Sequence, residues 1–215
     1  TLKRAYDQGL MQKDLRVIHW CPRCETALAE HEVRGEYYDV RDPSLYARFK
    51  LRDKPNEYLL VWTTTPWTLP ADMAVCVHPQ HPYARVAVGN EIYILAEALV
   101  EKVMKELGIE KYRVLGTTSG QELKGLRYKQ PLLNEVPKQQ ELVQHHRVIC
   151  GEHVTLEEGT GCVHTAPGHG EEDFLIGAEY NLPVFSPVGP DGKFTQEAGK
   201  YSGMFVKDAD RVILE

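Results

Sequence analysis

The chain has 215 residues, a length that suits one large domain or one domain with a small appendage. Its content of 42% hydrophobic and 26% charged residues is ordinary for a globular protein, and no run of about 18 apolar residues predicts a membrane-spanning helix. The 25 basic and 31 acidic residues give a net charge of −6, which argues against a surface built wholly for nucleic acid.

The five cysteines include three that stand alone, Cys76, Cys150 and Cys162. This pattern predicts reduced thiols and a cytoplasmic location rather than a disulfide framework. The chain begins without methionine and without the apolar core of a signal peptide, so we expect it to be a fragment of a longer protein.

Residues 1–30 predict a connecting segment at the entry to the domain. A weak helical pattern, with Leu2, Tyr6 and Leu10 on one side, predicts a helix over 1–14. Cys21 and Cys24 then form a Cys-x-x-Cys ribbon, which supplies two of the four ligands that zinc requires. We interpret this pair as half of a zinc site. A redox Cys-x-x-Cys pair fits less well, because such a pair normally lies at the start of a helix that follows a strand, and the residues between these two cysteines are typical of a loop.

The remaining elements predict an α+β fold with a β-barrel-like core of short strands and a few peripheral helices. Gly89-Asn90 is a two-residue hairpin signal, and Gly108 ends an amphipathic helix. The predicted strands are 30–33, 36–40, 45–49, 58–61, 73–77, 83–88, 91–95, 112–115, 142–143, 148–150 and 162–165. The predicted helices are 98–107 and 171–180, residues 126–142 are predicted as loop or edge, and His145, His146 and His153 are expected in solvent.

One stretch rich in threonine, from Trp62 to Asp72, follows the apolar strand at 58–61. Proline cannot donate to a strand ladder, so Pro66 ends the strand. Thr63 and Thr65 share one face of the extended segment and Thr64 points the other way, with Trp67 and Thr68 on the turn. Hydroxyls and methyls together suit a small pocket that senses both shape and polarity, although an ordinary β-prone run would look the same.

A second informative stretch runs from Glu158 to Asp173 and contains a short strand, a glycine-rich loop and a helix start. Gly161 permits a positive φ or a close backbone approach. His164 lies on the strand and Asp173 in the first turn of the helix, where an acid stabilises the helix end by about 0.3–1 kcal/mol. Taken singly, a core histidine and a helix-end acid explain these two residues; a carboxylate aimed at a cation is the alternative.

Together the two motifs, Trp-Thr-Thr-Thr-Pro-Trp-Thr-Leu-Pro-Ala and Gly-Thr-Gly-x-Val-His-Thr-Ala-Pro-Gly-His-Gly-x-x-Asp, resemble the editing domain of isoleucyl-tRNA synthetases. The resemblance covers the chain nearly end to end, so residues 1–215 are expected to form a single editing domain. The family often has asparagine where this chain has Asp72. The family's second cysteine pair would lie after Glu215, so zinc would need ligands from outside this chain, and no other cofactor is expected.

The resemblance implies post-transfer editing, in which the ester of valine mischarged on tRNA(Ile) is hydrolysed and the isoleucyl ester is rejected by pocket size. The tRNA 3′ end carrying valine and the remainder of an ATP-dependent isoleucine–tRNA ligase would be the partners, with no membrane involved. Asp173 would bind the α-ammonium group, and His164 would either exclude isoleucine or orient water. Thr64 would take part in catalysis. The residues expected to bind substrate are Thr63, Thr65, Trp67, Thr68, Asp72 and Gly161.

Two other function classes stay open from the residues alone. The first is a zinc-ribbon module that binds nucleic acid without catalysis, which would require four ligands and a basic face. The second is a thiol or metal hydrolase that uses Cys162 and His164, whose side chains share a strand face.

Overall fold

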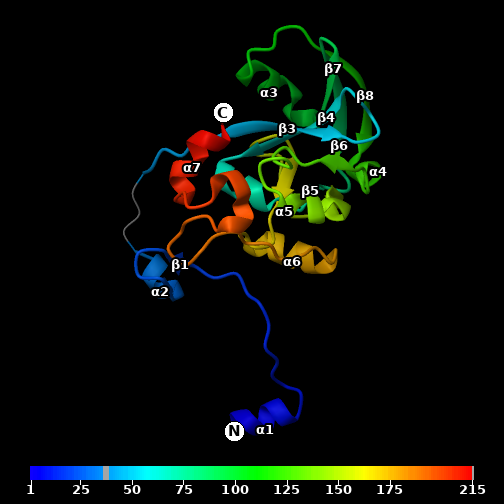
Figure 1. The fold of residues 1–215 in the computed structure, drawn as a ribbon. Coiled ribbons are helices and arrows are strands. Elements are labelled where there is room, and N and C mark those ends of the chain that lie inside the picture. Colours follow the sequence, from blue (N-terminus) through cyan, green and yellow to red (C-terminus); the bar gives the residue numbers. More distant parts are fainter. Residues whose placement is uncertain (36–38, 215) are drawn as a thin grey trace.

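The computed structural model describes residues 1–35 and 39–214 (Figure 1). Its main sheet has six strands in the order β8-β6-β7-β4-β3-β9, and a second sheet has three strands in the order β10-β5-β11. The strands of the main sheet are β3 (Leu45–Leu51), β4 (Glu57–Thr63), β6 (Pro82–Val88), β7 (Glu91–Ala96), β8 (Arg113–Ser119) and β9 (Tyr128–Lys129). Those of the second sheet are β5 (Ala74–Val77), β10 (Arg147–Cys150) and β11 (Cys162–Thr165).

The two sheets form the barrel-like core that the sequence predicts. An isolated bridge between Arg127 and Arg147 joins the β9 edge of the main sheet to β10, and the backbone N–H of Val148 donates to Leu126 O at 2.8 Å. On the other side of the barrel, β11 packs against β4. The α+β class is therefore confirmed, and the closure brings the ends of β4 and β11 together.

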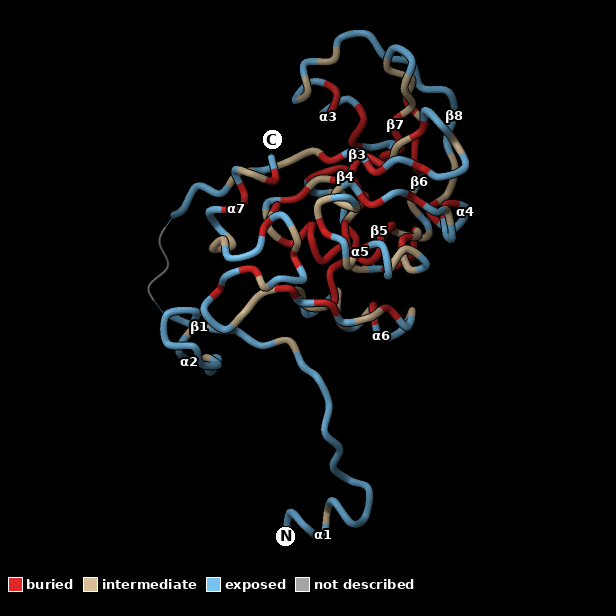
Figure 2. The backbone as a smooth tube through the Cα atoms, in the orientation of Figure 1, coloured by how far each residue is buried: buried red, intermediate tan, exposed pale blue. Residues whose placement is uncertain are grey.

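The core is built from aliphatic and aromatic side chains, most of them on these strands. Fully buried residues include Phe49, Leu59, Ile94 and Ile149, and Figure 2 shows the buried chain concentrated in the two sheets. Gly89-Asn90 joins β6 to β7 in the predicted antiparallel hairpin.

Short helices surround the sheets. The α-helices are α1 (Leu2–Asp7), α2 (Glu30–Val33), α3 (Val100–Glu106), α4 (Gly120–Leu123), α5 (Lys138–Glu141), α6 (Glu171–Glu179) and α7 (Val206–Ile213). The 3₁₀ helices are η1 (Pro66–Ala71), η2 (Glu97–Leu99), η3 (Val143–His145) and η4 (Gln196–Tyr201). Within the described residues, none of these helices is both long and apolar enough to cross a membrane.

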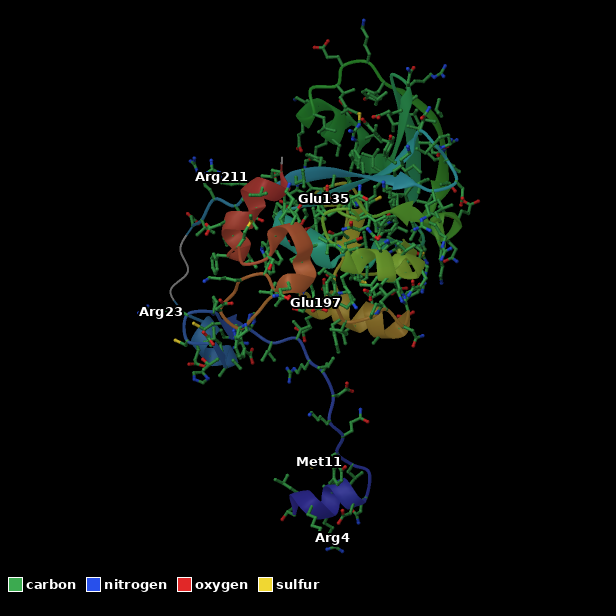
Figure 3. The ribbon with its side chains drawn as sticks, in the orientation of Figure 1. Arg4, Met11, Arg23, Glu135, Glu197 and Arg211 are labelled. Carbon is green, nitrogen blue, oxygen red and sulfur yellow. The ribbon has the colours of Figure 1, made fainter. Side chains whose placement is uncertain are left out.

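The N-terminal segment extends from the body of the molecule, as the positions of Arg4 and Met11 in Figure 3 show. The predicted helix over 1–14 is confirmed only for α1, whose residues are exposed or half-buried. The ribbon consists of the two-residue strands β1 (Trp20–Cys21) and β2 (Thr26–Ala27), which pair antiparallel. Trp20 Nε1 donates to Pro190 O at 2.8 Å and ties this ribbon to the turn near the C-terminus.

Several sequence-based predictions are wrong, among them the loop or edge expected over 126–142, which contains the helix α5. Residues 30–33 form α2, not a strand, because the Glu32 carboxylate accepts the Ala29 N–H at 2.7 Å and closes a local turn. Residues 143–145 form η3, because His145 N–H bonds to Leu142 O rather than to a neighbouring strand. His146 is fully buried rather than solvated. In the predicted strand at 36–40, residues 36–38 lie outside the described residues, and 39–40 are not in a strand.

Candidate functional site

The threonine-rich stretch changes from strand to 3₁₀ helix within three residues. β4 ends at Thr63, and η1 begins at Pro66, whose fixed φ suits the first helical position. A second proline, Pro70, lies inside η1, where the short 3₁₀ turn tolerates the missing N–H. The result is a tight reversal that places three threonine side chains over the end of β11.

Thr63, Thr65, Thr68 and His164 form what we call the threonine–histidine cluster. Thr68 Oγ1 lies 3.0 Å and Thr63 Oγ1 3.4 Å from His164 Nε2. Thr65 Oγ1 lies 3.3 Å from the Thr63 hydroxyl and 3.2 Å from the Thr68 hydroxyl. The hydroxyls of η1 and the imidazole of β11 are thus joined into one hydrogen-bonded network.

The network fixes the tautomer of His164. Thr68 Oγ1 donates its proton to Thr65 O at 2.8 Å, so it accepts at its contact with the imidazole. His164 Nε2 therefore carries the ring proton and donates it. Burial, with a smaller repulsion from His169, lowers the pKa of His164 to about 4, so the imidazole is neutral at physiological pH.

Asp72 lies behind His164 rather than on the surface of the pocket. Its carboxyl is fully buried, and Oδ1 lies 3.9 Å from His164 Nδ1. Tyr128 OH donates to Asp72 Oδ2 at 2.7 Å. Burial raises the pKa of Asp72 well above its usual value, while the hydrogen bond from Tyr128 opposes the shift. Asp72 is therefore a fully buried residue behind His164, held by the hydrogen bond from Tyr128.

Asp173 occupies the first turn of α6, but its side chain turns back toward the end of β11. Oδ2 accepts the backbone N–H of Ala166 at 2.9 Å, two residues after His164. Gly170 permits this geometry, because a Cβ there would lie only 2.9 Å from Asp173 Oδ2. Burial raises the pKa of Asp173, while the Ala166 N–H and His153 oppose the shift. A cation entering beside Asp173 would relieve this desolvation.

Trp67 lines a groove whose lining includes none of the four cluster residues. The indole packs edge-on against His169 with ring centroids 5.2 Å apart. The groove has a volume of about 830 Å³ and an apolar lining that includes Leu15, Trp20, Trp67, His169, Phe174 and Phe205. A flat or apolar part of a ligand could therefore lie in this groove beside Trp67.

Two of the predicted site residues lie apart from the cluster. Thr64 is exposed, whereas Thr63 is buried and Thr65 is half-buried. Gly161 has φ +74°, as the sequence suggested, but a Cβ at this position would meet Ala96 Cβ at 2.6 Å. Gly161 therefore serves the close packing of β11 against β7, and Tyr83 OH donates to its carbonyl at 2.6 Å.

The cysteines lie away from this network. Cys162 is buried and its Sγ points to Ile94 O at 3.7 Å, so the thiol and His164 do not form a pair. Cys21 and Cys24 stand at the surface of the ribbon, where the backbone N–H groups of Cys24 and Arg23 lower the pKa of Cys21. Within 1–35 and 39–214, no three His, Cys, Asp or Glu side chains gather so that they could hold a metal ion.

Sequence reasoning assigned no role to His169 or Asp210. His169 stood inside a quoted motif, but only the fold shows that its ring meets Trp67. Asp210 lies in α7 and accepts the backbone N–H of Trp67 at 2.8 Å, a contact that spans 143 residues. The only feature of the sequence that could have indicated Asp210 is an acidic residue on the apolar side of an amphipathic segment.

The fold and the site define a class of protein, the editing domains of aminoacyl-tRNA synthetases. The family model described as "Leucyl-tRNA synthetase, editing domain" matches residues 41–210. The crystal structure of GlLeuRS-CP1 has a similar fold, with a TM-score of 0.55 at 18% identity over 73% of this chain and 78% of that one.

The chain therefore belongs to this editing-domain family, and within it the resemblance to isoleucyl-tRNA synthetases is confirmed. It is 57% identical to an isoleucine–tRNA ligase of Thermococcus kodakarensis and 54% identical to one of Methanocaldococcus jannaschii, in each case over 100% of this chain. It spans only about a fifth of the length of these relatives, 21% and 22% respectively.

Proposed function

We propose that this chain hydrolyses the ester of valine mischarged on tRNA(Ile) and spares the isoleucyl ester. The observation that carries the proposal is the meeting of two motifs in one site. The hydroxyls of η1 bond to the imidazole of β11, and the Asp173 carboxylate is held at the end of the same strand. Editing is the general role of the family; the particular ester is our proposal.

The carboxylate of Asp173 would bind the α-ammonium group of the misattached amino acid. An ammonium group that leaves water needs an ionic partner, and Asp173 is partly buried, with one backbone donor, the Ala166 N–H, among the described residues. The exposed Glu171 and Glu172 share the helix end but not this position. Binding the ammonium group at Asp173 would fix the ester carbonyl near the threonine–histidine cluster.

The reaction consists of attack by water on the ester carbonyl carbon. The bond from this carbon to the ribose oxygen breaks, the water oxygen stays with valine as part of its carboxylate, and the ribose oxygen takes up a proton. The ester is activated enough that positioning a water and stabilising the oxyanion suffice. The hydroxyl of Thr65 could donate to the oxyanion, whereas Thr68, whose proton goes to Thr65 O, could only accept a hydrogen bond from the water. Exposed Thr64 would act at the entrance.

The neutral imidazole of His164 would hold the cluster in place and limit the side-chain end of the pocket. Its Nε2 proton is committed to Thr68 Oγ1, so the ring contributes shape and orientation rather than a positive charge. Discrimination by size then follows from how far an amino acid side chain can extend toward His164. The proposal includes no metal, and zinc on Cys21 and Cys24 would need ligands from elsewhere.

The natural setting would be the cytoplasm, as one part of an isoleucine–tRNA ligase that presents the tRNA 3′ end to this site. The apolar groove beside Trp67 would receive the terminal nucleoside. A nucleic-acid-binding zinc ribbon without catalysis explains neither the buried hydroxyl–imidazole network nor the carboxylate beside it.

The experiment is single-turnover deacylation of Val-tRNA(Ile) by the chain, compared with spontaneous hydrolysis. The variant Thr68→Val keeps the shape of the side chain and removes its hydroxyl, and exposed Thr117→Val is a control on β8. We expect the parent and Thr117→Val to accelerate ester loss and Thr68→Val to lose at least about tenfold in rate. A parent chain no faster than the spontaneous reaction would contradict the proposed function.

A further inference from the structure

The N-terminus of η1 has a donor that needs a partner. Pro66 has no N–H, and Thr68 N–H bonds to Thr65 O at 3.0 Å, so the free donor of the first turn is Trp67 N–H. In most helices such a donor is satisfied by the side chain of the residue at the N-cap. Here that residue is Thr65, and threonine is well suited to the task.

Thr65 does not cap its own helix. In the part of the chain that the structure describes, its side chain makes no capping bond. Its Oγ1 instead lies between the hydroxyls of Thr63 and Thr68, at 3.3 and 3.2 Å. The hydroxyl can stay in the threonine–histidine cluster only if another group satisfies Trp67 N–H.

Asp210 is that group. Its Oδ1 accepts the Trp67 N–H at 2.8 Å, and the residue is only 3% exposed. It projects from α7, which packs directly against η1 and lies beside it in Figure 1. Arg211, the next residue, is on the outer side of the same helix in Figure 3. The cap therefore comes from a helix about 140 residues further along the chain.

We propose that Asp210 is a positioning residue for the editing site: it caps η1 in place of Thr65 and so keeps the Thr65 hydroxyl in the pocket. This inference rests on the proposed function for its effect on rate. The carboxylate also fixes the backbone of Trp67, which sets the direction of the indole toward His169 and the groove. Through this contact, the docking of α7 controls the geometry of the threonine–histidine cluster, which contains no residue of α7.

The test uses two substitutions at Asp210 and two controls on the same helix. Asp210→Ala removes the acceptor, and Asp210→Asn keeps an oxygen that can accept the same N–H. Ile213→Ala weakens the packing of α7 without touching the hydrogen bond, because Ile213 is a buried residue of that helix. Arg211→Ala changes an exposed residue and should alter nothing.

The readouts are the single-turnover deacylation rate at saturating Val-tRNA(Ile) and the χ1 angle of Thr65 by NMR. We expect Asp210→Ala to slow deacylation about tenfold or more and to turn the Thr65 hydroxyl toward Trp67 N–H. Asp210→Asn should stay within about threefold of the parent, a partial loss that suits a neutral acceptor. Ile213→Ala should keep the parent χ1 and rate at temperatures well below its melting point.

A double substitution makes the test sharper. If Asp210 acts by freeing the Thr65 hydroxyl, then Thr65→Val should slow the parent but add little to the loss in Asp210→Ala. Additive losses, an unchanged Thr65 χ1 in Asp210→Ala, or equal losses in Ile213→Ala and Asp210→Ala would each overturn the inference. An inactive parent would defeat the proposed function alone, since the χ1 measurement would still decide the role of Asp210.

Discussion

Replacing Asp173 with asparagine separates the two roles that this residue can have, helix cap and ammonium partner. The asparagine side chain keeps the size of aspartate and an oxygen that can accept the Ala166 N–H now bonded at 2.9 Å. Only the negative charge is lost. The change therefore leaves the local backbone supported while removing the group that would pair with the substrate.

The expected effect on activity follows from the ionic bond. A hydrogen bond to a charged group contributes about 1.5–3 kcal/mol, which corresponds to a factor of about 10 to 150 in rate. Misplacement of the ester relative to water would add to this loss. We expect Asp173→Asn to lose at least about tenfold in single-turnover deacylation of Val-tRNA(Ile), and Asp173→Ala to lose no less.

Asp173→Asn is expected to lower activity but not to lower the stability of the fold. Burial raises the pKa of Asp173, so the folded chain binds this proton more tightly than the unfolded chain does. Such a group favours folding at low pH, and that contribution is lost as the pH rises through its folded pKa. Above the folded pKa the ionised, desolvated carboxylate is a cost to the folded state, so in that pH range Asp173→Asn should melt no lower than the parent.

The assay measures ester loss and melting temperature for the parent, Asp173→Asn and Asp173→Ala. Glu172→Gln serves as the matched control, because it removes the same charge from the same helix turn at an exposed position. Parent-like deacylation by Asp173→Asn would refute ammonium recognition and return Asp173 to the role of a helix cap. A large fall in the melting temperature of Asp173→Asn would refute the reasoning about its desolvation.

Three further predictions follow from the environments of single residues. Burial lowers the pKa of His146 from 6.5 to about 4, so below pH 6.5 the unfolded chain takes up a proton that the folded chain does not, and this opposes folding. The parent should therefore lose stability between about pH 6.5 and 4. In urea titrations this loss should be smaller for His146→Gln than for the parent. A steeper loss in the variant would contradict this sign. Cys162→Ala should retain deacylation within about threefold, since its buried thiol points to Ile94 O and not to His164; loss of the reaction would revive a thiol mechanism. Elemental analysis of the purified chain should find less than stoichiometric zinc on Cys21 and Cys24, because two thiolates leave the tetrahedral shell half empty, and one zinc per chain would show that ligands were missed.

The sequence correctly predicted the elements whose limits are set by neighbouring residues, such as turn glycines and apolar runs. Gly89-Asn90 marked the turn of the β6–β7 hairpin, and Gly108 marked the end of α3. The apolar runs at 58–61 and 162–165 form β4 and β11. Segments with weaker patterns were misjudged. Residues 30–33 alternate like a strand, but the bond from Ala29 N–H to Glu32 turns them into a helix.

The candidate site was predicted as a set of residues but not as an arrangement. The two motifs contain the threonines, His164 and Asp173. Their positions in the sequence did not predict that Thr68 Oγ1 lies 3.0 Å from His164 Nε2. That contact depends on the closure of the barrel between β4 and β11. For the same reason the support from Asp210 and Tyr128 could not be foreseen, since both reach the site from elements far along the chain.

The most direct test of the central claim is the ratio of two rates, deacylation of Val-tRNA(Ile) and of Ile-tRNA(Ile), measured with the same chain under the same conditions. A pocket distinguishes side chains that differ by one methylene by about 1–3 kcal/mol, a magnitude known for this amino-acid pair rather than worked from the present structure. The account predicts that the valyl ester is hydrolysed at least about tenfold faster than the isoleucyl ester. Equal rates for the two esters, or faster loss of isoleucine, would contradict it.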